Sequence, residues 1–396
     1  MAGQLGVDTE VVEAAHVQVP GWVREEFEVC RRMSYLDVAG RAPMAGRVHR
    51  ALTEFLGDCR TEGARKDRWL TEIAEIRTRA ASFIGADPEE VAFMKNTSDG
   101  LNSIALALEL QAGDNVVVSP AFEHANNVYP WLHLSDRGIE TRIVPMAEGR
   151  VDPAEVAKLI DDRTRVVTVS VVSAWTGART DLPALAELCR PRGIFLLADG
   201  AQSLGVIDTD VRALGVDALA GATQKGLLAM YGLGLLYVRS EWLPRLRPPF
   251  LSVSSAAREG IHDSAPVTSY QVRTDAAKFE TGNPNFAGML GFGASLSLLE
   301  EVGPQLVERR VTGLVTMMID ELRARGIEVA TPRPAQEHAG IVAFSPEDAP
   351  GAWRHLEDNG VRLSLRRGQL RAGLHIYNNE DDIARLLTHL DDYTPA

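Results

Sequence analysis

Hydrophobic positions between residues 91 and 238 form short apolar runs separated by stretches in which apolar residues recur every three or four positions. The short runs predict strands, which we place at 91–94, 115–119, 141–144, 166–172, 194–198, 218–220 and 234–238. The helical spacing predicts helices, which we place at 104–110, 125–134, 153–160, 182–189 and near 211. Strands alternating with helices imply an α/β fold with a largely parallel sheet covered on both faces.

The pattern differs on either side of this region. Before it, residues 35–40 predict a short strand and turn, and residues 45–86 have helical spacing. After it, we expect helices at 286–302, 311–326 and 380–390, with short strands at 327–329 and 341–344. We therefore predict three parts: an N-terminal arm (1–34) that joins the small domain, a large domain (35–285) and a small α+β C-terminal domain (286–396).

Several polar residues fall at or just after the ends of predicted strands, namely Thr97, His124, Ser173, Asp199 and Lys225. In a parallel sheet covered by helices, ligands bind beyond the carboxyl ends of the strands. The five positions therefore predict one shared site at that edge of the sheet.

Composition narrows the class of protein. The chain has 396 residues, 45% hydrophobic and 24% charged, as in soluble globular proteins. A formal net charge of -13 argues against nucleic acid and against anionic membranes as partners. No apolar run resembles a signal peptide or a membrane span. Cys30, Cys59 and Cys189 show neither a disulfide nor a metal-ligand spacing, so we expect a cytoplasmic protein without a metal.

Lys225 stands out among only five lysines because it follows an apolar strand and precedes a glycine. A lysine beside apolar sequence commonly reaches water with its amine. A desolvated lysine, however, has a lowered pKa and attacks carbonyl groups. Asp199 ends another apolar run 26 residues upstream, and a carboxylate can hold a pyridinium nitrogen. Together the two residues indicate Schiff-base chemistry with pyridoxal 5'-phosphate.

Each neighbouring motif has a structural and a functional interpretation. Thr97 and Ser98 suit a helix N-cap, or a phosphate bound at a helix N-terminus. His124 suits a surface loop, or a ring stacked on an aromatic cofactor. Asp199 suits a polar turn after a strand, or a partner of the pyridine nitrogen. In the second interpretation Ala201 would pack on the ring face opposite His124, and Gln202 would donate to the phenolic oxygen.

The ordered motifs carry a family resemblance: Asn96-Thr97-Ser98, Glu123-His124-Ala125-Asn126, Asp199-Gly200-Ala201-Gln202, Thr223-Gln224-Lys225, the segment 279–285, and Arg371 ahead of Tyr377-Asn378. From about residue 35 to its end, the chain resembles a class V aminotransferase of the fold-type I pyridoxal phosphate enzymes, the group that contains the cysteine desulfurases.

The resemblance implies a homodimer with the active site near the subunit interface. Thr223 and Lys225 would contact the cofactor, and Asn283 would reach the partner's phosphate, where relatives often have threonine. Arg371 would bind the α-carboxylate of an amino acid substrate, although an ordinary surface arginine is the alternative among 36. Lys225 would remove the α-proton, with His124 beside it. The substrate pocket would include Arg41, Trp175 and residues 250–258.

The chain departs from the desulfurase pattern. Desulfurases need a nucleophilic cysteine on the loop before the carboxylate-binding arginine, and here that loop, 362–370, has none. The serine and histidine before the desulfurase lysine become Ala222 and Gln224, which resembles the alanine– or serine–glyoxylate aminotransferases. The family's Ser-Asn reads Ser173-Ala174-Trp175, so Trp175 either walls the substrate pocket or belongs to the core.

These departures favour β-elimination from a cysteine S-conjugate, which is C–S lyase chemistry. The excess of arginine over lysine suggests a GC-rich bacterial genome and a role in secondary metabolism such as antibiotic biosynthesis. Decarboxylation coupled to oxidative deamination of such a conjugate is one alternative, and an aminotransferase is another. A non-catalytic protein that keeps the fold to bind a partner becomes the interpretation only if Lys225 forms no Schiff base.

Overall fold

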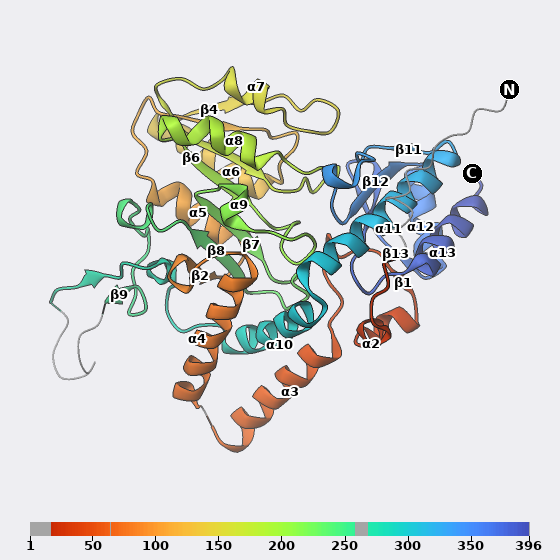
Figure 1. The fold of residues 1–396 in the computed structure, drawn as a ribbon, viewed down its shortest axis with the longest axis horizontal. Helices are drawn as coiled ribbons and strands as arrows, with labels where there is room; N and C mark the ends of the chain where they lie inside the picture. The colour runs from red at the N-terminus through yellow and green to blue at the C-terminus, as the bar shows by residue number, and fades with distance from the viewer. Residues whose placement is uncertain (1–16, 64, 258–267, 396) are drawn as a thin grey trace.

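The computed structural model describes residues 17–63, 65–257 and 268–395. Its centre is a seven-stranded sheet (Figure 1). In spatial order the strands are β2 (Val91–Met94), β8 (Gly234–Val238), β7 (Ala218–Ala222), β6 (Phe195–Asp199), β5 (Thr164–Ser170), β3 (Asn115–Val118) and β4 (Glu140–Ile143). Only β8 runs against the others in this sheet. The predicted mostly parallel sheet is therefore confirmed.

Helices bury both faces of this sheet. Along β6, Phe195 and Leu197 belong to one apolar cluster, while Leu196 and Ala198 belong to the other. Side chains alternate across a strand, so strands covered on both faces appear in the sequence as continuous apolar runs. One cluster includes residues of α5 (Thr97–Ala107) and the other includes residues of α8 (Leu182–Cys189) and α9 (Val211–Leu214). The shorter helices α6 (Tyr129–His133) and α7 (Pro153–Ala157) complete this part of the chain.

Three helices pack together beside this sheet. They are α3 (Gly46–Thr61), α4 (Lys66–Phe83) and α10 (Phe286–Val302), which lie together at the bottom of Figure 1. Helix α10 is apolar over most of its circumference, because α3 and α4 enclose it. It follows the predicted boundary at residue 285 yet packs on helices of the preceding part, and that boundary stays a prediction.

A second, four-stranded sheet lies in the blue part of Figure 1. Its order is β11 (Glu328–Val329), β12 (Ile341–Ser345), β15 (Gln369–Gly373) and β14 (Ser364–Arg366), all antiparallel. The helices of this region are α11 (Pro304–Ala324), α12 (Ala349–Asp358) and α13 (Glu380–Asp391). In addition, β9 (Ala256–Ala257) pairs with β10 (Gln271–Val272) elsewhere in the chain.

The described part of the N-terminal arm contacts these C-terminal elements. Strand β1 (Ser34–Tyr35) pairs in parallel with β13 (Val361–Arg362). Arg24 of α2 (Gly21–Glu25) forms an ion pair with Asp382 of α13 at 2.8 Å. The Asp382 carboxylate is almost fully buried, so the pair is less screened than a surface pair.

The structure differs from the predicted elements at several places. The segment 362–370, predicted as a loop, is mostly a β-hairpin of β14 and β15. Helix α5 begins at Thr97 rather than 104, because the Asn96 side chain accepts a hydrogen bond from the Asp99 amide (2.9 Å) and caps it. Helix α11 begins at Pro304 rather than 311, since proline suits the first turn. Helix α12 was not predicted. Across the described ranges, no helix has both the length and the apolar composition needed to cross a bilayer.

Candidate active site

A cavity of about 350 Å³ lies at the carboxyl edge of the seven-stranded sheet. Strands β2, β3, β6 and β7 run in one direction, so the residues that follow them meet at this edge. Seven predicted site residues line the cavity: Thr97, Ser98, His124, Asp199, Ala201, Gln202 and Lys225. Ser173, also predicted at a strand end, instead directs its hydroxyl to the Phe122 carbonyl (3.1 Å).

Lys225 follows β7 in a turn that other backbone holds closely. A Cβ on Gly205 would lie 2.3 Å from the Gly226 carbonyl oxygen, so only glycine fits there. The His375 ring, fully buried, bonds through Nε2 to the carbonyls of Gly205 (2.9 Å) and Gly226 (3.0 Å). Burial lowers the pKa of Lys225 to about 8; the Arg371 charge adds to this, and Asp199 opposes it. A lysine amine with a lowered pKa, held in place by its turn, suits a nucleophile.

Asp199 ends β6 and is 4% exposed. Its Oδ1 accepts a hydrogen bond from the Ala201 amide at 2.8 Å, and Oδ2 has no hydrogen-bond partner among the described residues. Burial raises the pKa of this carboxyl, with the Ala201 amide and Lys225 acting against it. A buried carboxylate with a free oxygen suits a pyridinium nitrogen, which would supply the missing positive partner.

The N-terminus of α5 forms another wall. A Cβ on Gly100 would lie 2.9 Å from the Ala220 Cβ, so the missing side chain brings the start of the helix close to β7. Thr97 Oγ1 is buried and has no hydrogen-bond partner among the described residues. Ser98 lines the same wall. Helix N-terminal amides together with a hydroxyl that needs a partner fit a phosphate group.

His124 lies in a stack of flat side chains. Its ring is nearly parallel to Trp175, at 11° and 5.9 Å between centroids, and the Arg367 guanidinium lies 3.8 Å from the Trp175 centroid. His124 Nδ1 accepts a hydrogen bond from the Asn126 amide (3.2 Å), so a neutral ring carries its proton on Nε2. Burial is the main cause that lowers the pKa of His124, and the positive charges of Lys225 and Arg371 lower it further. A neutral imidazole suits stacking on an aromatic cofactor.

Arg371 borders the cavity through its contact with Ala174. Its side chain is buried; Nη1 donates to the Ala174 carbonyl (2.9 Å) and Nε to Ser364 Oγ (3.2 Å). Its nearest carboxylate oxygen, Asp37 Oδ1, lies 3.9 Å from Nη2. Burial lowers the pKa of Arg371 to about 10, which leaves it charged at neutral pH. A buried guanidinium without a close acid suits a substrate carboxylate.

Besides Arg371, which reaches the cavity only through Ala174, four predicted residues do not line the cavity: Thr223, Trp175, Arg41 and Asn283. Thr223 directs its hydroxyl to the carbonyls of Met230 and Leu233 (2.9 and 3.0 Å), so it holds the turn that carries Lys225. Trp175 lies behind His124, and its indole N–H donates to the Glu123 carbonyl (2.7 Å). Arg41 is exposed. It lies beside the site, because the neighbouring Ala42 amide donates to the Gln224 carbonyl (2.8 Å).

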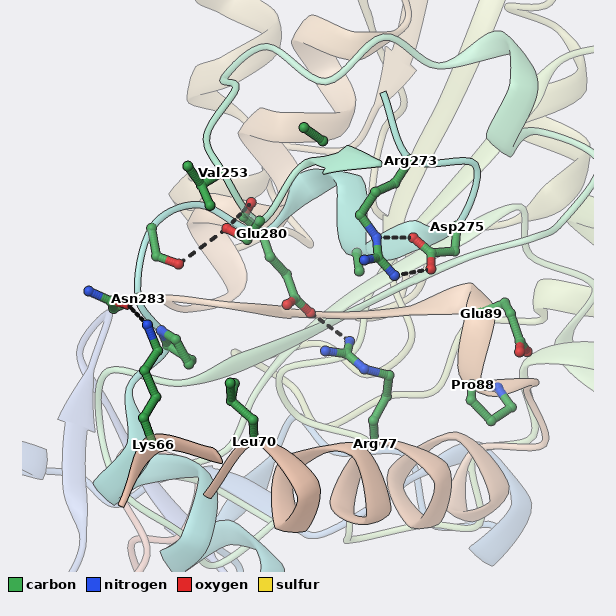
Figure 2. A pocket seen from close by; sticks show the side chains of 15 residues that line it. Lys66, Leu70, Arg77, Pro88, Glu89, Val253, Arg273, Asp275, Glu280 and Asn283 are labelled. Carbon is green, nitrogen blue, oxygen red and sulfur yellow. Dashed lines mark hydrogen bonds and ion pairs between the residues drawn. The ribbon is translucent and has the colours of Figure 1, made fainter. Parts of the chain in front are cut away.

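Asn283 lies in a second cavity of about 740 Å³ (Figure 2). There its side-chain oxygen accepts a hydrogen bond from Lys66 Nζ at 2.9 Å. Four of the six charged residues that line this larger cavity form ion pairs, Arg77 with Glu280 and Arg273 with Asp275. Paired charges leave no activated nucleophile, so the smaller cavity around Lys225 is the candidate active site. No group of three or more metal-binding side chains occurs within the parts of the chain that the structure describes.

Sequence reasoning missed three residues of this region. Ser170 lines the cavity, and its hydroxyl donates to the Glu123 carboxyl (2.6 Å), whose pKa burial raises to about 8. His375 bonds to the backbone that holds the Lys225 turn, and Arg367 stacks on Trp175. Only Ser170, a polar residue inside the predicted strand 166–172, had a signal in the sequence. The other two come from the C-terminal part of the chain and are placed by tertiary packing.

Together, the fold and this cavity define a fold-type I pyridoxal phosphate enzyme. A family model for aminotransferase class-V matches residues 34–386, and the chain belongs to this family. It is 32% identical to a probable cysteine desulfurase of Methanothermobacter thermautotrophicus, over 93% of this chain and 97% of that one.

Solved structures share the fold. An apo cysteine desulfurase from Thermococcus onnurineus superimposes with a TM-score of 0.86 at 25% identity, over 95% of this chain and 98% of that one. The cystine C-S lyase C-DES, solved in complex with its product cysteine persulfide, superimposes with a TM-score of 0.84 at 22% identity, over 92% and 98%.

Proposed function

We propose that this enzyme catalyses β-elimination from a cysteine S-conjugate, releasing a thiol. The observation that carries the proposal is the hairpin β14–β15, which contains Arg371 and has no cysteine. Desulfurases need a thiol there to take the sulfur atom. Without it, a sulfur leaving group has no protein acceptor and departs with its substituent.

The three cysteines support this. Cys30, Cys59 and Cys189 lie in the segments Glu28–Arg31, Gly46–Thr61 and Leu182–Cys189, and none lines the cavity. Burial raises the pKa of Cys30 and of Cys189 to about 12, so both thiols stay protonated. A protonated thiol is a poor nucleophile. The fold shared with C-DES does not by itself choose between lyase and desulfurase.

The chain's residues have separable roles in this chemistry. Arg371 binds the substrate α-carboxylate, and Lys225 in its amine form takes the proton from Cα. Pyridoxal phosphate, when bound, supplies the electron sink, and Asp199 holds its ring nitrogen protonated. The electron pair from the Cα–H bond forms a Cα=Cβ bond while the C–S bond breaks and the thiolate leaves. The released 2-aminoacrylate takes up water to give pyruvate and ammonium.

Incubation of the holoenzyme with S-ethyl-L-cysteine tests the proposal. We expect pyruvate and ethanethiol in equal amounts, and neither product from Lys225→Ala. Pyruvate without thiol would exclude the lyase assignment. Alanine and persulfide from free cysteine would restore the desulfurase. Carbon dioxide released from the substrate carboxylate would instead indicate decarboxylation coupled to oxidative deamination.

A second candidate function is an aminotransferase, and Gln224 favours it. This residue lines the cavity beside Lys225, where the desulfurases have histidine, and its side-chain oxygen is buried without a hydrogen-bond partner. An aminotransferase shifts the cofactor absorbance to that of the pyridoxamine form with an amino donor, and a keto acid reverses the shift. If no donor produces this half-reaction, the aminotransferase is excluded.

A further inference from the structure

Arg367 connects the tip of the β14–β15 hairpin to the loops around the cavity. Its guanidinium lies over the Trp175 ring, and Nη1 donates to the Ala121 carbonyl at 2.8 Å, in the loop that leads from β3 to His124. A guanidinium on an indole face gains a cation–π interaction. The stack Arg367–Trp175–His124 thus runs from the hairpin to the cavity wall.

The backbone at this position is unfavourable for arginine. Arg367 has φ +50° and the following Gly368 has φ +80°. A two-residue hairpin turn with both φ values positive favours Asn-Gly, and a bulky non-glycine residue in this region is strained. Such a residue persists where the surrounding contacts hold it, and strain of this kind concentrates at ligand sites.

The Arg367 guanidinium also has donors to spare. Of its five N–H groups, one bonds to Ala121, and no carboxylate lies within ion-pair distance of it in the described ranges. Arg371, on the same hairpin, has one long ion pair, in which its Nη2 lies 3.9 Å from Asp37 Oδ1. The two are four positions apart in the chain, so their Cα atoms are at most about 14 Å apart. Both cations are connected to residues of one cavity wall, Arg371 through Ala174 and Arg367 through Trp175 and His124, in a chain of net charge -13.

We infer that Arg367 recognises a carboxylate at the far end of the substrate side chain, while Arg371 binds the α-carboxylate. The substrate class is therefore an amino acid with a second, distal negative charge. In the terms of the proposed function, on which the choice of a cysteine thioether rests, this is a cysteine S-conjugate carrying a carboxylate on its S-substituent.

Two matched probes test this inference. S-carboxymethyl-L-cysteine carries the distal charge, and S-carbamoylmethyl-L-cysteine is its neutral counterpart of the same shape. Each is titrated into the holoenzyme, and Kd is read from the visible absorbance of the cofactor. We expect the charged probe to bind at least tenfold tighter to the wild type and no tighter than the neutral probe to Arg367→Gln. Arg366→Gln, the adjacent arginine bonded to its own strand at Leu365 (3.2 Å), keeps the preference.

Arg367→Asn guards against misfolding, because asparagine tolerates the positive φ that arginine strains. It removes the preference for the charged probe without lowering the thermal midpoint. A purely structural role for Arg367 would weaken both probes equally. The inference is overturned by a wild-type preference below twofold, by a preference that survives both Arg367 variants, or by no absorbance change with the charged probe.

The same titration separates this inference from the proposed function. Selective binding of the charged probe without thiol release removes the lyase assignment and keeps the inference. Thiol release at equal efficiency from both probes, with equal Kd values, keeps the lyase assignment and removes the inference.

Discussion

At the scale of single residues, the site depends on two ionisable groups whose pKa values burial shifts in opposite directions. Burial lowers the pKa of Lys225 and raises that of Asp199, so each carries less charge than it would in water. Their electrostatic attraction opposes both shifts. Asp199 keeps a free oxygen for a cationic partner, while Lys225 is prepared as an amine. This division of roles is what carbonyl chemistry at a pyridine cofactor requires.

Replacing Lys225 by alanine should remove the visible band of the lysine-bound cofactor and lower turnover by at least about a thousandfold, because Lys225 is the lysine of the cavity whose pKa burial lowers. The measurement is an absorbance spectrum of purified protein with added pyridoxal phosphate, together with borohydride trapping and peptide mapping. Lys158→Ala is the control, since Lys158 is exposed and paired with Glu155. A retained band in Lys225→Ala would contradict the assignment.

The lowered pKa of Lys225 predicts how cofactor uptake depends on pH. The amine loses its proton near pH 8 instead of near 10.5, and only the neutral amine attacks the aldehyde. The rate at which the apoprotein takes up pyridoxal phosphate should therefore rise with pH and level off above about pH 8. Stopped-flow absorbance at a series of pH values measures this rate. A rate still rising steeply beyond pH 10 would mean that burial does not activate this lysine.

At the scale of elements, the strands of the large sheet could be predicted because both of their faces are buried. β6 and β7 form uninterrupted apolar runs, and the polar residues that follow them mark the site edge. The hairpin β14–β15 could not be predicted, since its turn residues Arg367 and Gly368 lack the Asn-Gly pair that signals such a turn. The stack of Arg367 on Trp175 joins residues far apart in the chain, so no local pattern encodes it.

His375 illustrates how one element positions another. It lies after β15, yet its ring bonds to the two backbone carbonyls that hold the Lys225 turn. Burial lowers its pKa to about 4, so the folded protein keeps the ring neutral well below pH 6.5. The unfolded chain takes up a proton near pH 6.5, and stability therefore falls as pH drops from about 6.5 towards 4.

We expect His375→Asn to lower the free energy of unfolding at pH 7 by about 1–3 kcal/mol, because a carbonyl loses its partner. Between pH 7 and 5 the wild type should lose roughly 2 kcal/mol more than the variant, whose residue does not titrate. Urea titrations of the holoenzyme at both pH values measure the difference. His49→Asn, at an exposed position of α3, should follow the wild type. Parallel losses in the wild type and His375→Asn would rule out this role.

At the scale of the whole molecule, the two cavities belong to one proposed arrangement of subunits. Asn283 and Lys66 lie at the larger cavity, away from Lys225, and the exposed apolar residues Leu70 and Val253 line it too (Figure 2). Exposed apolar side chains grouped around a cavity mark an interaction surface. The homodimer stays a prediction, in which Asn283 of one subunit reaches the phosphate site of its partner.

Mixing two inactive variants tests that arrangement. In a dimer that joins Lys225→Ala with Asn283→Asp, one site combines an intact Lys225 with the intact Asn283 of the other subunit, while the second site carries both defects. Each variant alone has no intact site, because Asn283→Asp places a negative charge against the phosphate in both. After unfolding and refolding together, random pairing makes half of the dimers mixed, each with one working site. We expect about a quarter of wild-type activity.

If Asn283 served its own subunit, both sites of the mixed dimer would be defective and no activity would return. Asn283→Thr, the residue common in relatives, is the control: it should be active alone, which shows that the loss in Asn283→Asp comes from charge and not from misfolding.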